Sequence, residues 1–337
     1  MAADILLRGA AVYTMDPRRP RARNIAIAAG RIVACELESL DDLVGPGTRV
    51  LDLDGRAVVP GFVDAHIHFG SYAVTRQQVD LDLASTLDDG LQRLNEAAKQ
   101  LAPATTWLRG RGWDRNRWGR LPTAADLDAA VGDRPAALSS HDGHSLWLST
   151  AALQAVGIDR NTQPPPGGVI ERDEHGVPTG VLFENAQDLV RQSMPEFTDD
   201  EVHDAIRAAL PIGAAAGLTG IHNFEDSRSR RACQSLEASG ELTLRVYHSA
   251  ARRELSKARE LGLRTGAGSD LVRIGPVKLF SDGALGSRTA YMRKPYEGRA
   301  DGYRGVPTMQ PEELVEAMRL AAAGCCGRSQ QLEARPC

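Results

Sequence analysis

The chain has 337 residues, of which 42% are hydrophobic and 25% charged, with a formal net charge of −4. This length allows one large or two ordinary domains, and the apolar content suffices for a core. No basic run is interleaved with aromatic residues, which argues against a nucleic-acid or anionic-membrane partner. The first ten residues do not resemble a secretory signal, and no stretch reaches the roughly 20 apolar residues of a membrane span. Composition therefore predicts a soluble protein, with the cytoplasm as its default location.

Three short runs rich in Val, Ile and Leu open the chain, at residues 3–16, 24–35 and 48–59. Gly30-Arg31 and Asp54-Gly55 supply turns between or within these runs. We expect a small N-terminal β-unit over residues 1–57.

The next segment, 58–69, reads VVPGFVDAHIHF and ends an apolar β-type run with His66 and His68. Residues two apart in a strand share a face, so the two imidazoles can bind one ion. A chance His-x-His pair would occur in roughly one such chain in five, and paired core or surface histidines are the alternative. We predict that residues 61 to 69 form a strand that brings both imidazoles to one metal ion.

The residues around this pair favour a metal site over the alternative. Pro60-Gly61 breaks the chain at the entry to the strand, and Asp64 precedes the histidines. Phe62 and Val63 are expected to be buried. Zinc is commonly bound by such histidines together with further ligands and an open position for water.

Residues 70–197 contain too many structural signals to form a loop. An amphipathic helix is expected where Leu87, Leu91, Leu94, Ala98 and Leu101 share a face, and residues 107–112 have the composition of a strand. The run at 164–168, PPPGG, predicts a turn or hinge within this region.

From Leu218 onward, strands alternate with helices. The strand-like runs are LTGIHNF, LTLRVYHSA and VRIGPVKLF, separated by helical stretches, and this alternation predicts βα units with a parallel sheet. A helix with capping-box spacing is expected from Thr198 and Glu201 to Gly217, and another from Pro311 to Gly324.

Several segments together resemble a known family. DLDGRAVVPGFVDAHIH is similar to the first barrel strand of the amidohydrolase superfamily. Segments 110–118, 139–153, 167–186 and 277–290 are similar, in this order, to amidohydrolase family 3, which includes N-substituted formamide deformylases. The resemblance covers about residues 4–324. It implies an α/β fold, a TIM-type (β/α)8 barrel with a small N-terminal β-sandwich unit and an inserted α/β subdomain at 70–197.

Only about the first half of that barrel is expected here. Residues 58–69 would be its first strand and 198–324 its strands 2–4 with their helices, whereas a complete barrel takes about 250 residues. The last thirteen residues, 325–337, read CCGRSQQLEARPC and form an atypical tail without an apolar run, histidine or aspartate. The cysteines there have no disulfide or zinc-ligand spacing. We interpret the chain as C-terminally truncated, with a genuine polar tail as the alternative.

The resemblance implies further metal ligands. A lysine at the end of the fourth barrel strand can be carboxylated in this family and bridge two metals. Counting the strands that end near His66, His222, His248 and Lys278 puts Lys278 at the fourth. Strand alternation lets its amine point into the barrel, whereas an ordinary lysine paired with Asp282 is the alternative. Glu184 in VLFENA is an alternative carboxylate ligand.

Substrate contacts are expected at the C-terminal strand ends and in the insertion, which would lie over the mouth of a barrel. The residues expected to contact substrate are His144, Trp113, Asp114, His222 and His248. Core or rim packing is the alternative for the last two histidines and for the tryptophan. Asp142-Gly143 is expected to form a structural turn.

The resemblance implies a metal-dependent amidohydrolase that hydrolyses an amide-like, non-peptide C–N bond by attack of a metal-bound hydroxide. The cofactor would be one or two divalent ions, with zinc as the first choice, and the partner a small-molecule amide. Homo-oligomerisation is left open. The family's final-strand aspartate has no counterpart here, so no catalytic residue is assigned. A catalytically inactive truncated fragment is the alternative, and esterase or deaminase chemistry would suit the same scaffold.

Overall fold

The computed structural model describes residues 2–101, 107–283, 285, 289–297 and 302–322. The tail at 325–337 and the expected helix stop at Gly324 lie outside these residues. The chain divides into two compact units, Met1–Ala65 with Gly213–Ile221 and His66–Ile212 with His222–Cys337.

The strands are β1 (Ile5–Arg8), β2 (Ala11–Tyr13), β3 (Arg21–Ala22), β4 (Asn24–Ala28), β5 (Arg31–Glu36), β6 (Arg49–Asp52), β7 (Ala57–Val58), β8 (Phe62–Ile67), β9 (Val79–Asp80), β10 (Leu108–Trp113), β11 (Ala136–Ser140), β12 (Ser145–Leu148), β13 (Gly168–Arg172), β14 (Pro178–Glu184), β15 (Leu218–Asn223), β16 (Arg245–Ala251) and β17 (Val272–Lys278). The helices are α1 (Phe69–Arg76), α2 (Leu87–Gln100), α3 (Arg115–Trp118), α4 (Ala124–Val131), α5 (Thr150–Ala155), α6 (Asp188–Arg191), α7 (Asp199–Ala215), α8 (Ser227–Ala238), α9 (Leu255–Glu260) and α10 (Pro311–Ala322), with short 3-10 turns η1 (Asp41–Leu43), η2 (Asn185–Gln187) and η3 (Arg252–Glu254).

The first unit contains the expected N-terminal β-structure, as two small sheets with strand orders β5-β4-β1-β6 and β3-β2-β7. Each sheet contributes buried apolar side chains, among them Leu6 and Val12. Asp54 and Gly55 both have positive φ, which suits the tight turn predicted there. The other turn is at Ala29-Gly30, one residue earlier than predicted.

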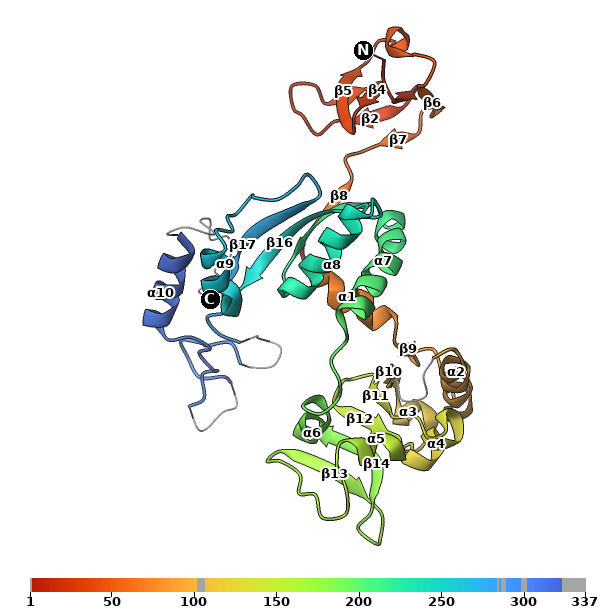
Figure 1. Cartoon of the computed structure of the whole chain (residues 1–337), viewed down its shortest axis with the longest axis vertical. Coiled ribbons are helices and arrows are strands. Elements are labelled where there is room, and N and C mark those ends of the chain that lie inside the picture. Colours follow the sequence, from red (N-terminus) through yellow and green to blue (C-terminus); the bar gives the residue numbers. More distant parts are fainter. Residues whose placement is uncertain (1, 102–106, 284, 286–288, 298–301, 323–337) are drawn as a thin grey trace. The chain divides into compact units, whose positions relative to one another are not determined.

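A third sheet carries the predicted βα units, in the order β17-β16-β15-β8. β16 and β17 are parallel, with Ala251 opposite Lys278. β8 and β15 also run in the same direction, because Phe62 N–H donates to Gly217 O and Phe224 N–H donates to Ile67 O. Helix α8 packs against β16 and β17 (Figure 1). The strands predicted from Leu218 onward are confirmed.

The first strand of this sheet differs from the prediction in two respects. β8 ends at Ile67 rather than residue 69, and His68 is the N-cap of α1. Phe62 and Val63 are 62% and 59% exposed, so the expectation that they are buried is wrong. β8 is the outermost strand of the described sheet, and an outer strand has a neighbour on only one side.

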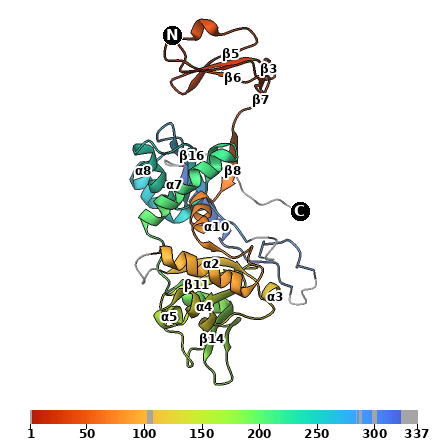
Figure 2. The same cartoon turned by 90° about the vertical axis from the view of Figure 1, so that its right-hand side faces the viewer.

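The region expected to be inserted forms its own sheet, in the order β13-β14-β12-β11-β10-β9. Buried apolar residues of α2, α4, β10 and β11 form a common core. Figure 2 shows α2 and α4 next to each other on this sheet, and their residues are in contact. The helix and the strand predicted from residues 87–101 and 107–112 are therefore present as α2 and β10.

The predicted cap of α7 is also present. Thr198 N–H donates to the Glu201 carboxylate at 2.7 Å, and Glu201 N–H donates to Thr198 Oγ1 at 3.1 Å. These two bonds form a capping box. Gly217, just after the helix, has a φ of 79° as predicted. The helix predicted from Pro311 is present as α10, in which Val315 is 45% exposed.

Candidate active site at the C-terminal strand ends

Within the second unit, one open cavity of about 1080 Å³ lies where the sheet strands end. His68 follows β8, Phe224 follows β15, Arg252 follows β16, and Lys278 is the last residue of β17; all four line the cavity. In folds built from parallel βα units, ligands bind at this edge of the sheet. The cavity is therefore the candidate active site.

The two histidines of the HIH segment are close enough to bind one ion. Their ring centroids are 5.7 Å apart, with a 55° angle between the planes. Imidazoles that bind a tetrahedral zinc ion at about 2.0–2.1 Å place their ring centroids roughly 5 Å apart. The observed separation of 5.7 Å is close to that value, so the spacing of the two rings is compatible with two ligands of one ion.

The amine of Lys278 lies in the same cavity, between two aromatic rings. Its Nζ is 5.2 Å from the ring centroid of Phe224 and 5.1 Å from that of Phe280. The ring of His66 packs on Phe224 as well, at 4.3 Å between centroids. The predicted ligands thus approach the same phenyl ring from β8 and β17. Asp282, the alternative partner of Lys278, instead accepts from Tyr291 N–H and Ser281 Oγ.

The described residues supply no group of three or more His, Cys, Asp or Glu side chains that could hold a metal ion. Glu184, the alternative ligand, lies in the inserted sheet, where it pairs with Nδ1 of His144 at 3.0 Å. Among the candidate ligands, the described structure thus brings His66, His68 and Lys278 around Phe224, whereas Glu184 pairs with His144.

A partly buried carboxylate fixes the junction between the HIH segment and α1. Glu225 accepts hydrogen bonds from Gly70 N–H and Ser71 N–H, each at 2.7 Å. Asn223 Oδ1 accepts the N–H of Phe69 at 2.9 Å. Burial raises the pKa of the Glu225 carboxyl, but these donors outweigh it and hold that pKa below its ordinary value. Together these bonds satisfy the first free N–H groups of α1.

Two histidines expected to contact substrate lie outside the cavity lining. His248 is 1% exposed, and its Nδ1 lies 3.3 Å from the Asn223 amide nitrogen. Burial, together with Arg230, lowers the pKa of His248 to about 4. His222 packs on the ring of Tyr247, at 5.0 Å between centroids. Neither histidine lines the cavity, so the structure places both beside it.

The insertion residues form a separate polar cluster. His144 is exposed, and its hydrogen bond to Glu184 raises the pKa of the imidazole. Asp142 accepts from Ser140 Oγ and from His144 N–H, as in the predicted structural turn. Glu184 has a φ of 51°, which is uncommon for a residue with a side chain and is found at functional sites.

The remaining insertion residues have structural roles. Trp113 is 2% exposed, and its Nε1 donates to Leu138 O at 2.8 Å, so it packs in the core. Asp114 is the N-cap of α3 and accepts from Asn116 N–H. The packing alternative therefore describes Trp113 better than pocket lining does.

Sequence reasoning missed Asn223, Phe224 and Glu225. They line or support the cavity because they come at or directly after the end of β15. The signal that could have found them is the NFE segment after a predicted strand, the same rule that singled out Lys278.

The family is shown by comparison with known proteins. The amidohydrolase family model matches residues 49–325, most of the sequence. The chain therefore belongs to the amidohydrolase family.

Its relatives include enzymes and proteins of unassigned activity. The putative amidohydrolase YtcJ of Bacillus subtilis is 35% identical over 324 residues, which cover 93% of this chain and 60% of that protein. The N-substituted formamide deformylase of Arthrobacter pascens is 30% identical over 300 residues, which cover 84% of this chain and 55% of that enzyme. The chain thus spans little more than half the length of these relatives.

Solved structures agree with the fold. An uncharacterized metal-dependent hydrolase from Pyrococcus furiosus is 26% identical with a TM-score of 0.77, covering 95% of this chain and 65% of that one. Its counterpart from Pyrococcus horikoshii is 25% identical with a TM-score of 0.75, covering 95% and 63%. None of the described helices is long and apolar enough to cross a membrane.

Proposed function

We propose that this protein is a metal-dependent hydrolase of an amide-like, non-peptide C–N bond. The observation that carries the proposal is the meeting of His68 and Lys278 in one cavity at the C-terminal strand ends, with His66 beside them. Membership of the amidohydrolase family supports the reaction class. The similarity to a deformylase supports a small amide as substrate.

The proposed scaffold is the first half of a (β/α)8 barrel. Four neighbouring strands taken in chain order, β8, β15, β16 and β17, support it, as do the helices α1, α8 and α9 that follow the first three of them. The two small N-terminal sheets would correspond to a β-sandwich unit, and the six-stranded sheet to the inserted subdomain.

The proposed roles follow from the side chains in the cavity. A divalent metal, zinc as first choice, would lower the pKa of water and polarise the amide carbonyl. His66 and His68 would hold it, and a carboxylated Lys278 would add an anionic ligand. Glu225 positions His68, because it holds the first turn of α1. His144, kept basic by Glu184, is proposed to contact the substrate.

The test measures metal content and turnover together. The wild type, a His66→Ala plus His68→Ala double variant and a His175→Ala control would be compared for bound metal and for hydrolysis of simple N-formyl amines. His175 is exposed on the insertion and lies outside the cavity lining. We expect the double variant alone to lose metal, because it lacks both imidazole ligands. Equal metal content in all three proteins would contradict the assignment.

The donor count favours a second candidate, a chain that binds metal without turnover. The described residues contain no group of three or more His, Cys, Asp or Glu side chains that could hold a metal ion. Loss of a general acid or base typically costs about 10² to 10⁴ in rate. Metal bound through His66 and His68 without detectable hydrolysis would identify this case.

A further inference from the structure

The cavity that holds His68 and Lys278 has more basic than acidic side chains in its wall. Its two acids are Glu225 and Asp226. Glu225 is occupied by the N–H groups of α1. Asp226 caps α8 and pairs with Arg253 at 3.3 Å. Neither acid is therefore available to neutralise a further cation.

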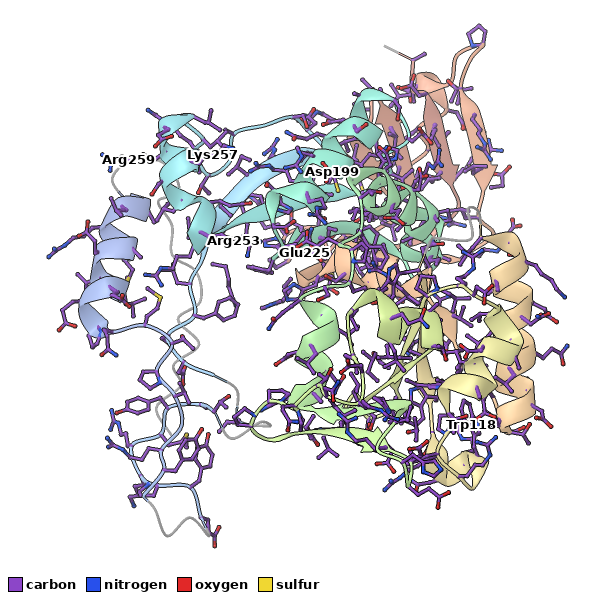
Figure 3. All side chains as sticks on the ribbon, turned by 60° about the horizontal axis from the view of Figure 1, so that its bottom comes forward. Trp118, Asp199, Glu225, Arg253, Lys257 and Arg259 are labelled. Atoms are coloured by element: carbon purple, nitrogen blue, oxygen red, sulfur yellow. The ribbon has the colours of Figure 1, made fainter. Side chains whose placement is uncertain are left out.

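One of the lining arginines stands out. Arg228 pairs with Glu196 at 2.7 Å and with Asp199 at 3.2 Å, and Arg253 pairs with Asp226. Arg252, in contrast, makes no ion pair or side-chain hydrogen bond with any residue that the structure describes, although it lines the same cavity. Figure 3 shows the η3–α9 segment that begins with Arg252, labelled at Arg253, Lys257 and Arg259.

The sheet register fixes how near Arg252 lies to the proposed metal ligand. Ala251 is the Cα partner of Lys278 in the parallel pair of β16 and β17. Arg252 is the next residue, so its Cα lies within about 9 Å of the Lys278 Cα. A small substrate can span that distance between a reacting amide and a charged substituent.

A second observation on the same strand points to a ligand. Ser249 is 1% exposed and lines the cavity, and its buried Oγ has no hydrogen-bond partner in the described chain. Ser249 and Ala251 are two apart in β16 and so share a face. A buried hydroxyl without a partner costs free energy, which an oxygen acceptor in the cavity would recover.

We propose that Arg252 binds a carboxylate carried by the substrate, with Ser249 donating a further hydrogen bond. The guanidinium presents two parallel N–H donors that match a carboxylate. That this carboxylate belongs to the substrate rests on the proposed hydrolase function. The substrate class is then an amide with a carboxylate a few bonds from the scissile C–N bond, such as an N-formyl amino acid.

Binding to the metal-free 337-residue chain tests the site directly. The probes are N-formyl-phenylalanine and N-formyl-phenethylamine, which differ by one carboxylate, with affinity measured by calorimetry or ligand-observed NMR. We expect the wild type to prefer the carboxylate probe, and Arg252→Gln to weaken that probe about tenfold while leaving the neutral probe unchanged. Ser249→Ala should weaken it less.

Arg259→Gln is the matched control. Arg259 is another exposed arginine of the same segment, and it does not line the cavity. Equal affinity of the wild type for the two probes would overturn the proposal. An equal loss of affinity for N-formyl-phenylalanine in Arg252→Gln and Arg259→Gln would overturn it as well. Binding of inorganic phosphate through Arg252 without binding of N-formyl-phenylalanine would overturn the assignment to a carboxylate. Circular dichroism of each variant checks that it is folded.

The outcome is separable from that of the proposed function, because binding is measured without metal. If the chain binds the carboxylate probe through Arg252 but shows no metal-dependent hydrolysis, the proposed hydrolase function is wrong and the carboxylate-binding site remains. If the chain hydrolyses both probes with equal kcat/KM and binds them with equal affinity, the proposed hydrolase function stands and the proposed role of Arg252 is wrong.

Discussion

His248 illustrates how burial decides the chemistry of a single residue. Its side chain lies in β16 beneath the cavity wall, and its pKa is lowered to about 4 by burial and by Arg230. The amide nitrogen of Asn223 lies 3.3 Å from Nδ1 of His248. Nε2 of His248 has no partner in the described chain. His248 is thus a neutral imidazole at neutral pH.

This state predicts a pH-dependent stability. The folded pKa of His248 lies below the ordinary value of 6.5, so the unfolded chain binds more protons between about pH 6.5 and pH 4. The contribution is fully present above pH 6.5 and is lost as the pH falls to about 4, by up to about 3 kcal/mol. Urea unfolding at several pH values should show a flatter dependence for His248→Gln than for the wild type.

An exposed histidine provides the control for this prediction. His175→Gln should keep the wild-type pH dependence, because that side chain is exposed in a loop. If His248→Gln and the wild type lose the same free energy of unfolding between pH 6.5 and 4, the buried neutral imidazole is not the cause.

Sequence alone predicts some of these residues and not others, for physical reasons. The nearness of His66 and His68 follows from their spacing in the chain, although only His66 lies in β8 and His68 caps α1. The core position of Trp113 depends on the surrounding inserted sheet, and the pairing of Glu184 with His144 joins residues 40 positions apart. The unpaired state of Arg252 depends on which acids are already occupied. Such features follow from packing rather than from local pattern.

At the scale of elements, the junction of β8 and α1 is the structural support of the site. Glu225 accepts two N–H groups of the first turn of α1, which places a negative charge at the positive end of the helix. The carboxylate also lies close to residue 70, so a side chain there would require Glu225 or Ser229 to shift. A Cβ there would lie 2.7 Å from Glu225 Oε2 and 2.9 Å from Ser229 Oγ.

We expect Glu225→Gln to lower the free energy of unfolding by about 1–3 kcal/mol, because an amide leaves one buried donor poorly satisfied and removes the charge. Gly70→Ala should destabilise as well, by displacing the same carboxylate. Chemical unfolding measures both, and Glu260→Gln, at the exposed end of α9, is the control. A Glu225→Gln protein as stable as the control would mean that the carboxylate does not anchor α1.

The secondary-structure elements were mostly predictable, and their surroundings were not. The capping box at Thr198 and the glycine after α7 are local signals, and both are present. The exposure of Phe62 and Val63 could not be read from an apolar run, because it depends on whether another strand or helix covers β8. Hydrophobicity predicts that a strand prefers burial, but not which element provides it.

At the scale of the whole molecule, the four-stranded sheet β17-β16-β15-β8 has few neighbours at its edges. β8 is the outer strand on one side. β17 is the outer strand on the other, where residues 266–269 pair with its first half through hydrogen bonds to Val272 and Ile274. Outer strands with unpaired backbone groups readily pair with further strands. The chain also spans only 60% of the length of YtcJ.

We therefore predict that extending the chain with the C-terminal portion of a YtcJ-type relative raises metal affinity, thermal stability and turnover of N-formyl amines together. Additional strands would cover the open edges, and a tetrahedral metal needs ligands beyond the two imidazoles. The same extension with His66→Ala plus His68→Ala is the control, which should gain stability but not metal-dependent turnover. Thermal unfolding, metal analysis and kinetics would compare the proteins. Cooperative unfolding and equal metal-dependent turnover by the 337-residue chain alone would contradict this prediction.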